Sequence, residues 1–169
     1  MGKLEAPTIE TERLILRRKM ECDIPNMVKM FNTEDVRKYL GGYPPRDERS
    51  MLGMIRHRNN NQWAVILKKN EEFIGECLLS NVTDNIMGHI GYIFMKKYWG
   101  KGYSNEAVSE IINYSKCNLG LKRLYASIDK NNIRSIKFTE KLNFEYIALL
   151  PEYNFGGRVA DVLYYSKIL

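Results

Sequence analysis

The segment from Tyr92 to Val108, YIFMKKYWGKGYSNEAV, has the residue types and the spacing of a ligand-binding loop. An apolar run leads into a loop with Gly100 and Gly102, and a helical pattern starts directly after it. Glycine lets the backbone approach a ligand closely, and the free N–H groups and the dipole of a helix start attract phosphate. We therefore expect an anion site at Gly100–Asn105; the alternative is a plain strand-to-helix turn without a ligand.

The residues of this loop exclude two well-known phosphate motifs. A Walker A loop has Lys and then Ser or Thr after its last glycine, whereas Tyr103 follows Gly102. A Rossmann fingerprint needs a third glycine at the position of Asn105, and it belongs to a βαβ unit. The strands that we expect before this loop are joined as hairpins, so neither nucleotide motif applies.

A second motif, NIRSIKFTEKLNF, runs from Asn132 to Phe144, one expected strand after the first. With this motif in place, the chain resembles the GNAT superfamily of acetyltransferases, and within it the ribosomal-protein N-acetyltransferase branch. The family's pyrophosphate loop has the form Gln/Arg-x-x-Gly-x-Gly/Ala. Its next motif has the form Asn-x-x-Ser/Ala, usually Tyr, and then Glu-Lys-Leu-Gly-Phe. The positions that fit these two frames are Trp99, Gly102 and Ser104, and then Asn132, Ser135, Glu140, Lys141, Leu142 and Phe144.

The resemblance covers essentially the whole chain, because the opening TERLILR and the closing DVLYY also look like this branch. It implies direct transfer of an acetyl group from acetyl-CoA, the co-substrate, to an amine, with no covalent enzyme intermediate. The backbone of residues 92–94 would pair with the pantetheine arm, and an N–H there would polarise the thioester carbonyl. The loop would hold the pyrophosphate and Asn132 would bond to the arm. The cofactor-binding residues so implied are Tyr92, Ile93, Phe94, Trp99, Gly100, Lys101, Gly102, Tyr103, Ser104, Asn132 and Ser135.

The same resemblance suggests where protons move. Thr139 stands where many family members carry a tyrosine that protonates the departing thiolate, so we place the general acid on Ser135, one helical turn earlier. The alternative is that Ser135 only packs or caps its helix. For the general base, Glu76 is our first candidate and His89 the second. Either residue could instead be an ordinary polar group of the sheet.

The elements that must position these residues follow from the hydrophobic pattern. Short apolar runs bounded by turn residues indicate strands, and apolar residues three and four apart indicate helices. The expected order is strand, two helices, three hairpin-linked strands, helix, strand, helix and two strands, an α+β domain around a mixed, mostly antiparallel sheet. The strands expected are Thr8–Arg18, Trp63–Leu67, Phe73–Val82, His89–Met95, Leu124–Ile128, Phe144–Leu149 and Val159–Ile168. The helices expected start at Asp23, Asp47, Ser104 and Ile133. Turns or element ends are expected at Gly41-Gly42, Asp84-Asn85, Gly120 and Asn143.

Composition narrows the class of protein. A chain of 169 residues with 44% hydrophobic and 27% charged residues is typical of one globular domain, 1–169. No apolar run reaches the roughly 20 residues of a membrane span, and the N-terminal residues do not resemble a secretory signal, so we expect a cytoplasmic protein. Three widely spaced cysteines predict reduced, mostly buried thiols, and no residue cluster has metal-ligand spacing.

The sequence does not identify the amine acceptor. The two early helices, which would wall the acceptor side in this fold, carry mixed charge. A protein N-terminus, a polyamine and an antibiotic amine all stay open, as does a homodimer. A non-catalytic acyl-CoA-binding domain is the alternative class, since the usual tyrosine is missing at Thr139. The net charge of +6 fits a polyanionic co-substrate, whereas no nucleic-acid-binding motif is present.

Overall fold

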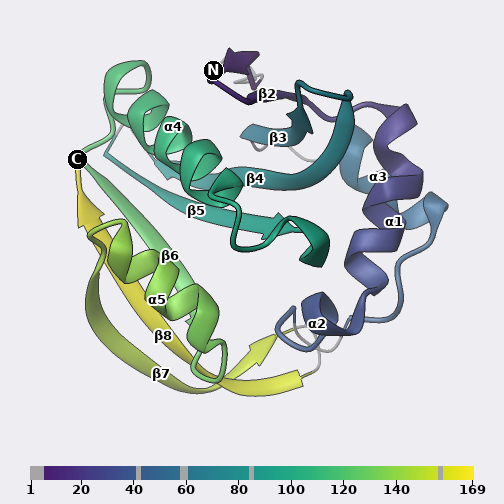
Figure 1. Ribbon diagram of the computed structural model, residues 1–169. Coiled ribbons are helices and arrows are strands. Elements are labelled where there is room, and N and C mark those ends of the chain that lie inside the picture. The colour runs from purple at the N-terminus through teal and green to yellow at the C-terminus, as the bar shows by residue number, and fades with distance from the viewer. Residues whose placement is uncertain (1–5, 41–42, 58–60, 84–85, 156–157) are drawn as a thin grey trace.

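The computed structural model describes residues 6–40, 43–57, 61–83, 86–155 and 158–169. One eight-stranded sheet, in the order β1-β2-β3-β4-β5-β6-β8-β7, forms its centre (Figure 1). The strands are β1 (Ile9–Glu10), β2 (Leu14–Arg18), β3 (Asn61–Leu67), β4 (Glu72–Thr83), β5 (Met87–Phe94), β6 (Arg123–Asp129), β7 (Glu145–Phe155) and β8 (Arg158–Ile168). The helices are α1 (Ile24–Asn32), α2 (Glu34–Arg37), α3 (Glu48–His57), α4 (Tyr103–Cys117) and α5 (Ile133–Lys141), with the 3-10 turns η1 (Glu21–Asp23) and η2 (Lys96–Tyr98).

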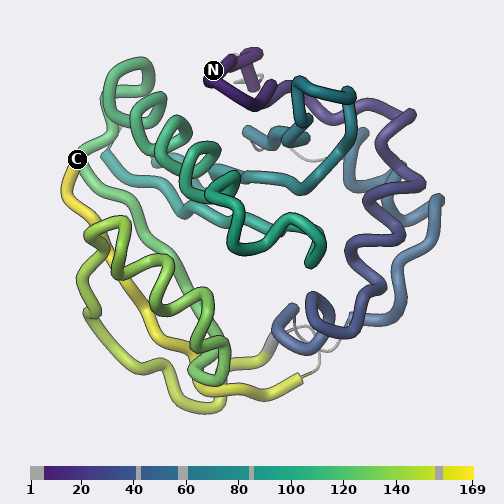
Figure 2. The backbone as a smooth tube through the Cα atoms, viewed as in Figure 1, coloured from purple at the N-terminus to yellow at the C-terminus, as the bar shows by residue number. Residues whose placement is uncertain are grey.

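The sheet is mixed because one pair of neighbouring strands, β5 and β6, is parallel, while every other pair is antiparallel. This pair is short: only Met87–His89 of β5 is in register with Arg123–Tyr125 of β6. Beyond those residues the two strands diverge, which Figure 2 shows as the separation of the two backbones. The predicted α+β class, the antiparallel hairpins and the mixed sheet are confirmed.

The two faces of the sheet carry different helices. Successive strand residues point to opposite faces, so Glu76 and Cys77 mark the two faces of β4. Trp63 is the register partner of Cys77, and its ring packs edge-on against Tyr114 of α4, with ring centroids 5.7 Å apart. We call this side, which α5 also covers, the α4 face; Figure 1 shows both helices in front of the strands.

The opposite side, which holds Glu76, is the α1 face. Arg17 of β2 is in register with Ala64, the partner of Glu76, and so shares its face. The Arg17 guanidinium makes two hydrogen bonds of 2.8 Å to the carboxylate of Asp23, at the start of α1. A helix on each side buries the central strands, and β3 is buried along its whole length.

Several details differ from the sequence prediction. The expected strand Thr8–Arg18 is two strands, because the Thr11 hydroxyl accepts from the Leu14 N–H at 3.0 Å and turns the chain back on itself. Asp23 occupies the N-cap position of α1, but its carboxylate bonds to Arg17 and the Met20 N–H instead of capping the helix. An additional short helix, α2, follows α1.

The prediction of mostly buried thiols is wrong. Cys77 is buried, but Cys22 in η1 and Cys117 at the end of α4 are exposed, because both lie at the solvent side of a terminal turn. Gly120 and Asn143 have the expected left-handed conformation. The expected turns at 41–42 and 84–85 lie outside the described residues. No helix in the described ranges is long and apolar enough to cross a membrane.

Candidate active site

The glycine loop offers unpaired donors next to open space. Gly100 and Gly102 have φ of 75° and 83°, the left-handed region that glycine adopts at little cost. A Cβ at Gly100 would meet no atom within 4 Å. Helix α4 begins immediately afterwards, and nothing in the described chain accepts hydrogen bonds from the N–H groups of residues 103–105. These donors at a helix N-terminus fit the diphosphate of a nucleotide co-substrate.

A network from the first strands holds this loop in place. The Arg13 guanidinium donates to the Lys101 carbonyl at 3.1 Å and to the Glu106 carboxylate at 2.6 Å, and lies 4.6 Å from the centre of the Tyr103 ring. The Thr11 hydroxyl also donates to Glu106, at 2.5 Å. The conformation of the loop is therefore fixed by contacts with a segment about 90 residues earlier in the chain.

Arg134 is a residue of this site that sequence reasoning missed. Its guanidinium lies 4.2 Å from the ring centre of Trp99, and the Trp99 indole N–H donates to the Phe94 carbonyl at 2.7 Å. The stack connects the loop after β5 with the first turn of α5. A cation at a helix N-terminus is unfavourable because it opposes the helix dipole. The unfavourable position of Arg134 in the first turn of α5 is the signal in the sequence that could have identified it as a ligand for an anion.

Three hydroxyl groups meet on the α4 face of β5. The Tyr92 phenol oxygen lies 2.7 Å from Oγ of Ser135 and 3.1 Å from Oγ1 of Thr139. The Tyr92 ring packs edge-on against Phe138, and burial raises the pKa of the phenol. The sequence assigned only the backbone of Tyr92 to the site. Its side chain brings a phenol to the turn of α5 where Thr139 replaces the family's tyrosine.

Asn132 occupies the N-cap position of α5. Its side-chain oxygen caps α5 by accepting from the Ser135 N–H at 3.2 Å. The amide NH₂ has no acceptor among the described residues and is free to bind a ligand. Asn132 thus orients Ser135 and can also donate to a co-substrate in the space where β5 and β6 diverge.

Glu76, the first candidate for the base, lies in a buried polar cluster on the α1 face. It is 1% exposed, and its Oε2 lies 2.7 Å from the ammonium of Lys19, which is 4% exposed. The contact is an ion pair without hydrogen-bond geometry, so Oε2 has no hydrogen-bond donor among the described residues. Lys19 also donates to the Gln62 amide at 3.0 Å. That Glu76 lies on the acceptor side stays a prediction, and the structure shows that its charge already has a partner in Lys19.

His89, the second candidate, lies on the same face where β5 and β6 begin to diverge. Its Nε2 is 2.8 Å from Oγ of Ser127 on β6. Burial lowers the pKa of the imidazole below its usual 6.5, so the ring is neutral at pH 7. A neutral imidazole can accept a proton, and which ring nitrogen does so depends on the tautomer that Ser127 selects.

The donor and acceptor groups thus lie on opposite faces of one strand. Tyr92 and Ser135 are on the α4 face. His89 lies three residues before Tyr92 and pairs with Ser80, so it is on the α1 face with Glu76. A thioester between the diverging strands could release sulfur toward the hydroxyl groups while an amine approaches from the other side. This arrangement suits direct transfer without a covalent enzyme intermediate.

Comparison with known proteins agrees with this geometry. The family model of the acetyltransferase (GNAT) domain matches residues 13–145. The uncharacterized N-acetyltransferase p20 of Bacillus licheniformis is 32% identical over 95% of this chain and 96% of its own. Two solved structures share the fold. Spermidine N-acetyltransferase from Vibrio cholerae, in complex with CoA and spermine, has a TM-score of 0.82 at 18% identity, covering 94% of this chain and 96% of that one. Ribosomal-protein-S5-alanine acetyltransferase from Vibrio fischeri has a TM-score of 0.75 at 22% identity, covering 96% of each chain.

The matched segment includes the glycine loop, β5, β6 and the hydroxyl cluster, and it spans well over half of the residues. The relative from Bacillus licheniformis covers nearly all of both chains. The chain therefore belongs to the GNAT family and is an acetyl-CoA-dependent N-acetyltransferase.

Proposed function

We propose that this transferase acetylates the α-amine at the N-terminus of a protein or peptide. The observation that carries the reaction type is the divergence of β5 from β6 beside the glycine loop, with hydroxyl groups on one face and proton acceptors on the other. For the acceptor, support comes from the resemblance of the two motifs to the ribosomal-protein branch. The solved structure of ribosomal-protein-S5-alanine acetyltransferase, which has the same fold, adds to it. A polyamine is the second candidate, because a spermidine acetyltransferase has the same fold.

We expect the co-substrate to be held by donors whose hydrogen atoms have no acceptor among the described residues. The free N–H groups at the start of α4 and the Arg134 guanidinium would bind the phosphates, and the Asn132 amide would bind the pantetheine arm. The free edge of β5 at residues 92–94 would pair with that arm. Acetyl-CoA supplies the activated acetyl group; the residues of the chain position it and move protons.

On the α4 face, Ser135 would donate its proton to the departing sulfur. The Tyr92 phenol, 2.7 Å away, then returns a proton to Ser135, so one S–H bond forms as one phenolic O–H bond breaks. Because the raised pKa keeps Tyr92 protonated at neutral pH, the phenol is ready to donate. Tyr92 acts through Ser135 and is a positioning residue in this scheme. The amine loses a proton that passes to solvent, and solvent returns a proton to the Tyr92 phenolate.

On the α1 face, the contacts support His89 ahead of Glu76 as the base. His89 is neutral and bonds to a single hydroxyl, whereas Glu76 is fully buried against Lys19. The Glu76 carboxylate is already the counter-charge of the buried Lys19 ammonium, and breaking a buried ion pair is costly. Glu76 would then serve to fix Lys19 and the end of β2 beneath the acceptor.

The decisive experiment is incubation of the protein with acetyl-CoA and a panel of amines, polyamines and peptides, with acetylation measured by mass spectrometry. We expect mass increases of one acetyl group on peptide α-amines. If acetyl-CoA binds by calorimetry but no peptide in the panel is acetylated, the proposal of a peptide α-amine as acceptor is wrong. Acetylation of spermidine alone would replace the peptide with the polyamine as acceptor.

A further inference from the structure

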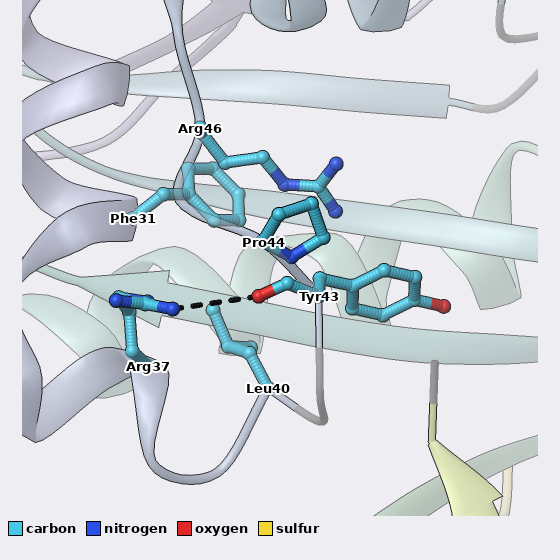
Figure 3. A pocket seen from close by; sticks show the side chains of 6 residues that line it. All are labelled: Phe31, Arg37, Leu40, Tyr43, Pro44 and Arg46. Atoms are coloured by element: carbon cyan, nitrogen blue, oxygen red, sulfur yellow. Dashed lines mark hydrogen bonds between the residues drawn. The ribbon is translucent and has the colours of Figure 1, made fainter. Parts of the chain in front are cut away.

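A pocket between α1, α2 and the following loop combines an apolar lining with two arginines. Phe31, Leu40 and Pro44 supply its apolar surface, and Arg37 and Arg46 approach from either side of the Tyr43–Pro44 segment, as Figure 3 shows. The pocket is a hollow that is open to solvent. The two motifs of the sequence do not include this pocket.

Its walls are fixed in place. The Asn32 side chain, at the end of α1, accepts from the Arg46 N–H at 2.8 Å and donates to the Arg46 carbonyl at 2.7 Å. Both arginines contact Tyr43: the Arg37 guanidinium reaches its carbonyl at 3.5 Å, and the Arg46 guanidinium lies 4.9 Å from its ring centre. The two cations are therefore held around one residue instead of extending separately into solvent.

The charges of this region are not balanced inside the pocket. The sequence showed mixed charge on the early helices, and the structure pairs some of it outside the pocket: Asp35 with Lys96 at 2.6 Å and Arg56 with Glu21 at 2.8 Å. The Asp47 carboxylate accepts from the Ser50 N–H at 2.7 Å and caps α3. Within the described ranges, Arg37 and Arg46 have no ion-pair partner, although both face the same apolar surface.

The pocket lies at the open end of the diverging strands. Asp35 of α2 pairs with Lys96, directly after β5, and the Lys38 carbonyl, at the end of α2, accepts from Arg158 at 2.6 Å. Arg158 also bonds to Asp129, the last residue of β6, at 2.7 Å. Helix α2 is thus connected to the ends of both strands whose separation forms the site, so an acceptor entering on the α1 face passes this pocket.

We propose that the pocket binds a carboxylate of the acceptor, and that the acceptor is a peptide with acidic residues soon after its N-terminal amine. The inference rests on the proposed function and specifies its substrate class. Two unpaired guanidinium groups beside aliphatic and aromatic surface match an Asp or Glu side chain on an extended peptide. The same charges repel a polyamine, which carries several ammonium groups.

The test uses two short peptides with the same first residue, one with aspartates and the other with asparagines at the next positions, and spermidine as a third ligand. Binding to the full protein in the presence of CoA is measured by calorimetry, and initial rates are measured separately. The acidic peptide should bind at least about 10-fold more tightly than its neutral partner, and the difference should shrink in high salt. Arg46→Gln and Arg37→Gln should each weaken the acidic peptide alone by about 10-fold. Arg49→Gln, an exposed arginine outside the pocket, is the matched control and should change neither peptide.

The binding experiment keeps the two proposals separate. Equal affinity for the two peptides, or tighter binding of spermidine, overturns the acidic-peptide inference even if the protein is an active transferase. Tight, arginine-dependent binding of the acidic peptide without acetylation would support the pocket and reject the proposed acetylation of peptide α-amines. Acetyl-CoA affinity should be the same in both arginine variants; if it falls with peptide affinity, the two side chains act on the co-substrate and not on the acceptor.

Discussion

Removal of one oxygen atom, in Tyr92→Phe, tests the hydroxyl cluster most directly. The variant deletes hydrogen bonds of 2.7 Å to Ser135 and 3.1 Å to Thr139 and keeps the ring that packs against Phe138. Each such bond contributes about 0.5–1.5 kcal/mol net, so the free energy of unfolding should fall by about 1–3 kcal/mol. For a chain of 169 residues this corresponds to a decrease in Tm of about 2–12 °C.

The effect on turnover distinguishes a proton donor from a packing residue. Without the phenol, Ser135 has no nearby acid to return its proton, and we expect kcat to fall by about 10- to 10³-fold, at the low end of general-acid effects because a thiolate is a good leaving group. Acetyl-CoA affinity, measured by calorimetry, should stay within about 2-fold of the parent, since no phosphate contact changes. The assay follows free thiol release under saturating acceptor.

A double-mutant cycle decides how Tyr92 acts. If Tyr92 and Ser135 donate in one step, the variant carrying both Tyr92→Phe and Ser135→Ala should lose about as much turnover as the more damaging single variant. Strictly additive losses would refute the relay. Parental turnover in Tyr92→Phe, together with a lower Tm, would show that the cluster only stabilises the contact between β5 and α5.

Three further outcomes follow from the site. Gly102→Asp should weaken acetyl-CoA by at least roughly 10-fold, because it places a negative charge beside the phosphate donors; Gly120→Asp, with the same positive φ but outside the loop, controls for backbone strain and should bind normally. His89→Gln should reduce turnover by about 10²–10⁴-fold, whereas Glu76→Gln should mainly lower Tm; the reverse result in steady-state rates restores Glu76 as the base. Because burial lowers the pKa of His89, the base is active above that pKa, so the acid limb of the kcat profile should lie below pH 6.5 and disappear in His89→Gln; a limb that survives the substitution belongs to another group.

The sequence by itself determined the parts of the site that lie close together along the chain. The glycine loop and the start of α4 are contiguous, and their conformation follows from residue types with few alternatives: glycine at positive φ and a helix with free N–H groups. Asn132 and Ser135 are three residues apart, so the cap between them was likewise predictable. That Glu76 and His89 share one face became known only from the register of β4 and β5.

Contacts between distant segments depended on the tertiary structure. Tyr92 meets Ser135 across 43 residues only because β5 leaves β6 after three register pairs and α5 packs over the resulting edge. Lys19 reaches Glu76 because the end of β2 lies beside β3 and β4, which no local pattern indicates. The sequence also did not show which charges are paired. It showed mixed charge on the early helices, whereas in the structure Asp35 pairs with Lys96, and Arg37 and Arg46 have no ion-pair partner among the described residues. Local rules fix conformation over a few residues, but the partner of a buried or charged side chain is set by the packing of the whole sheet.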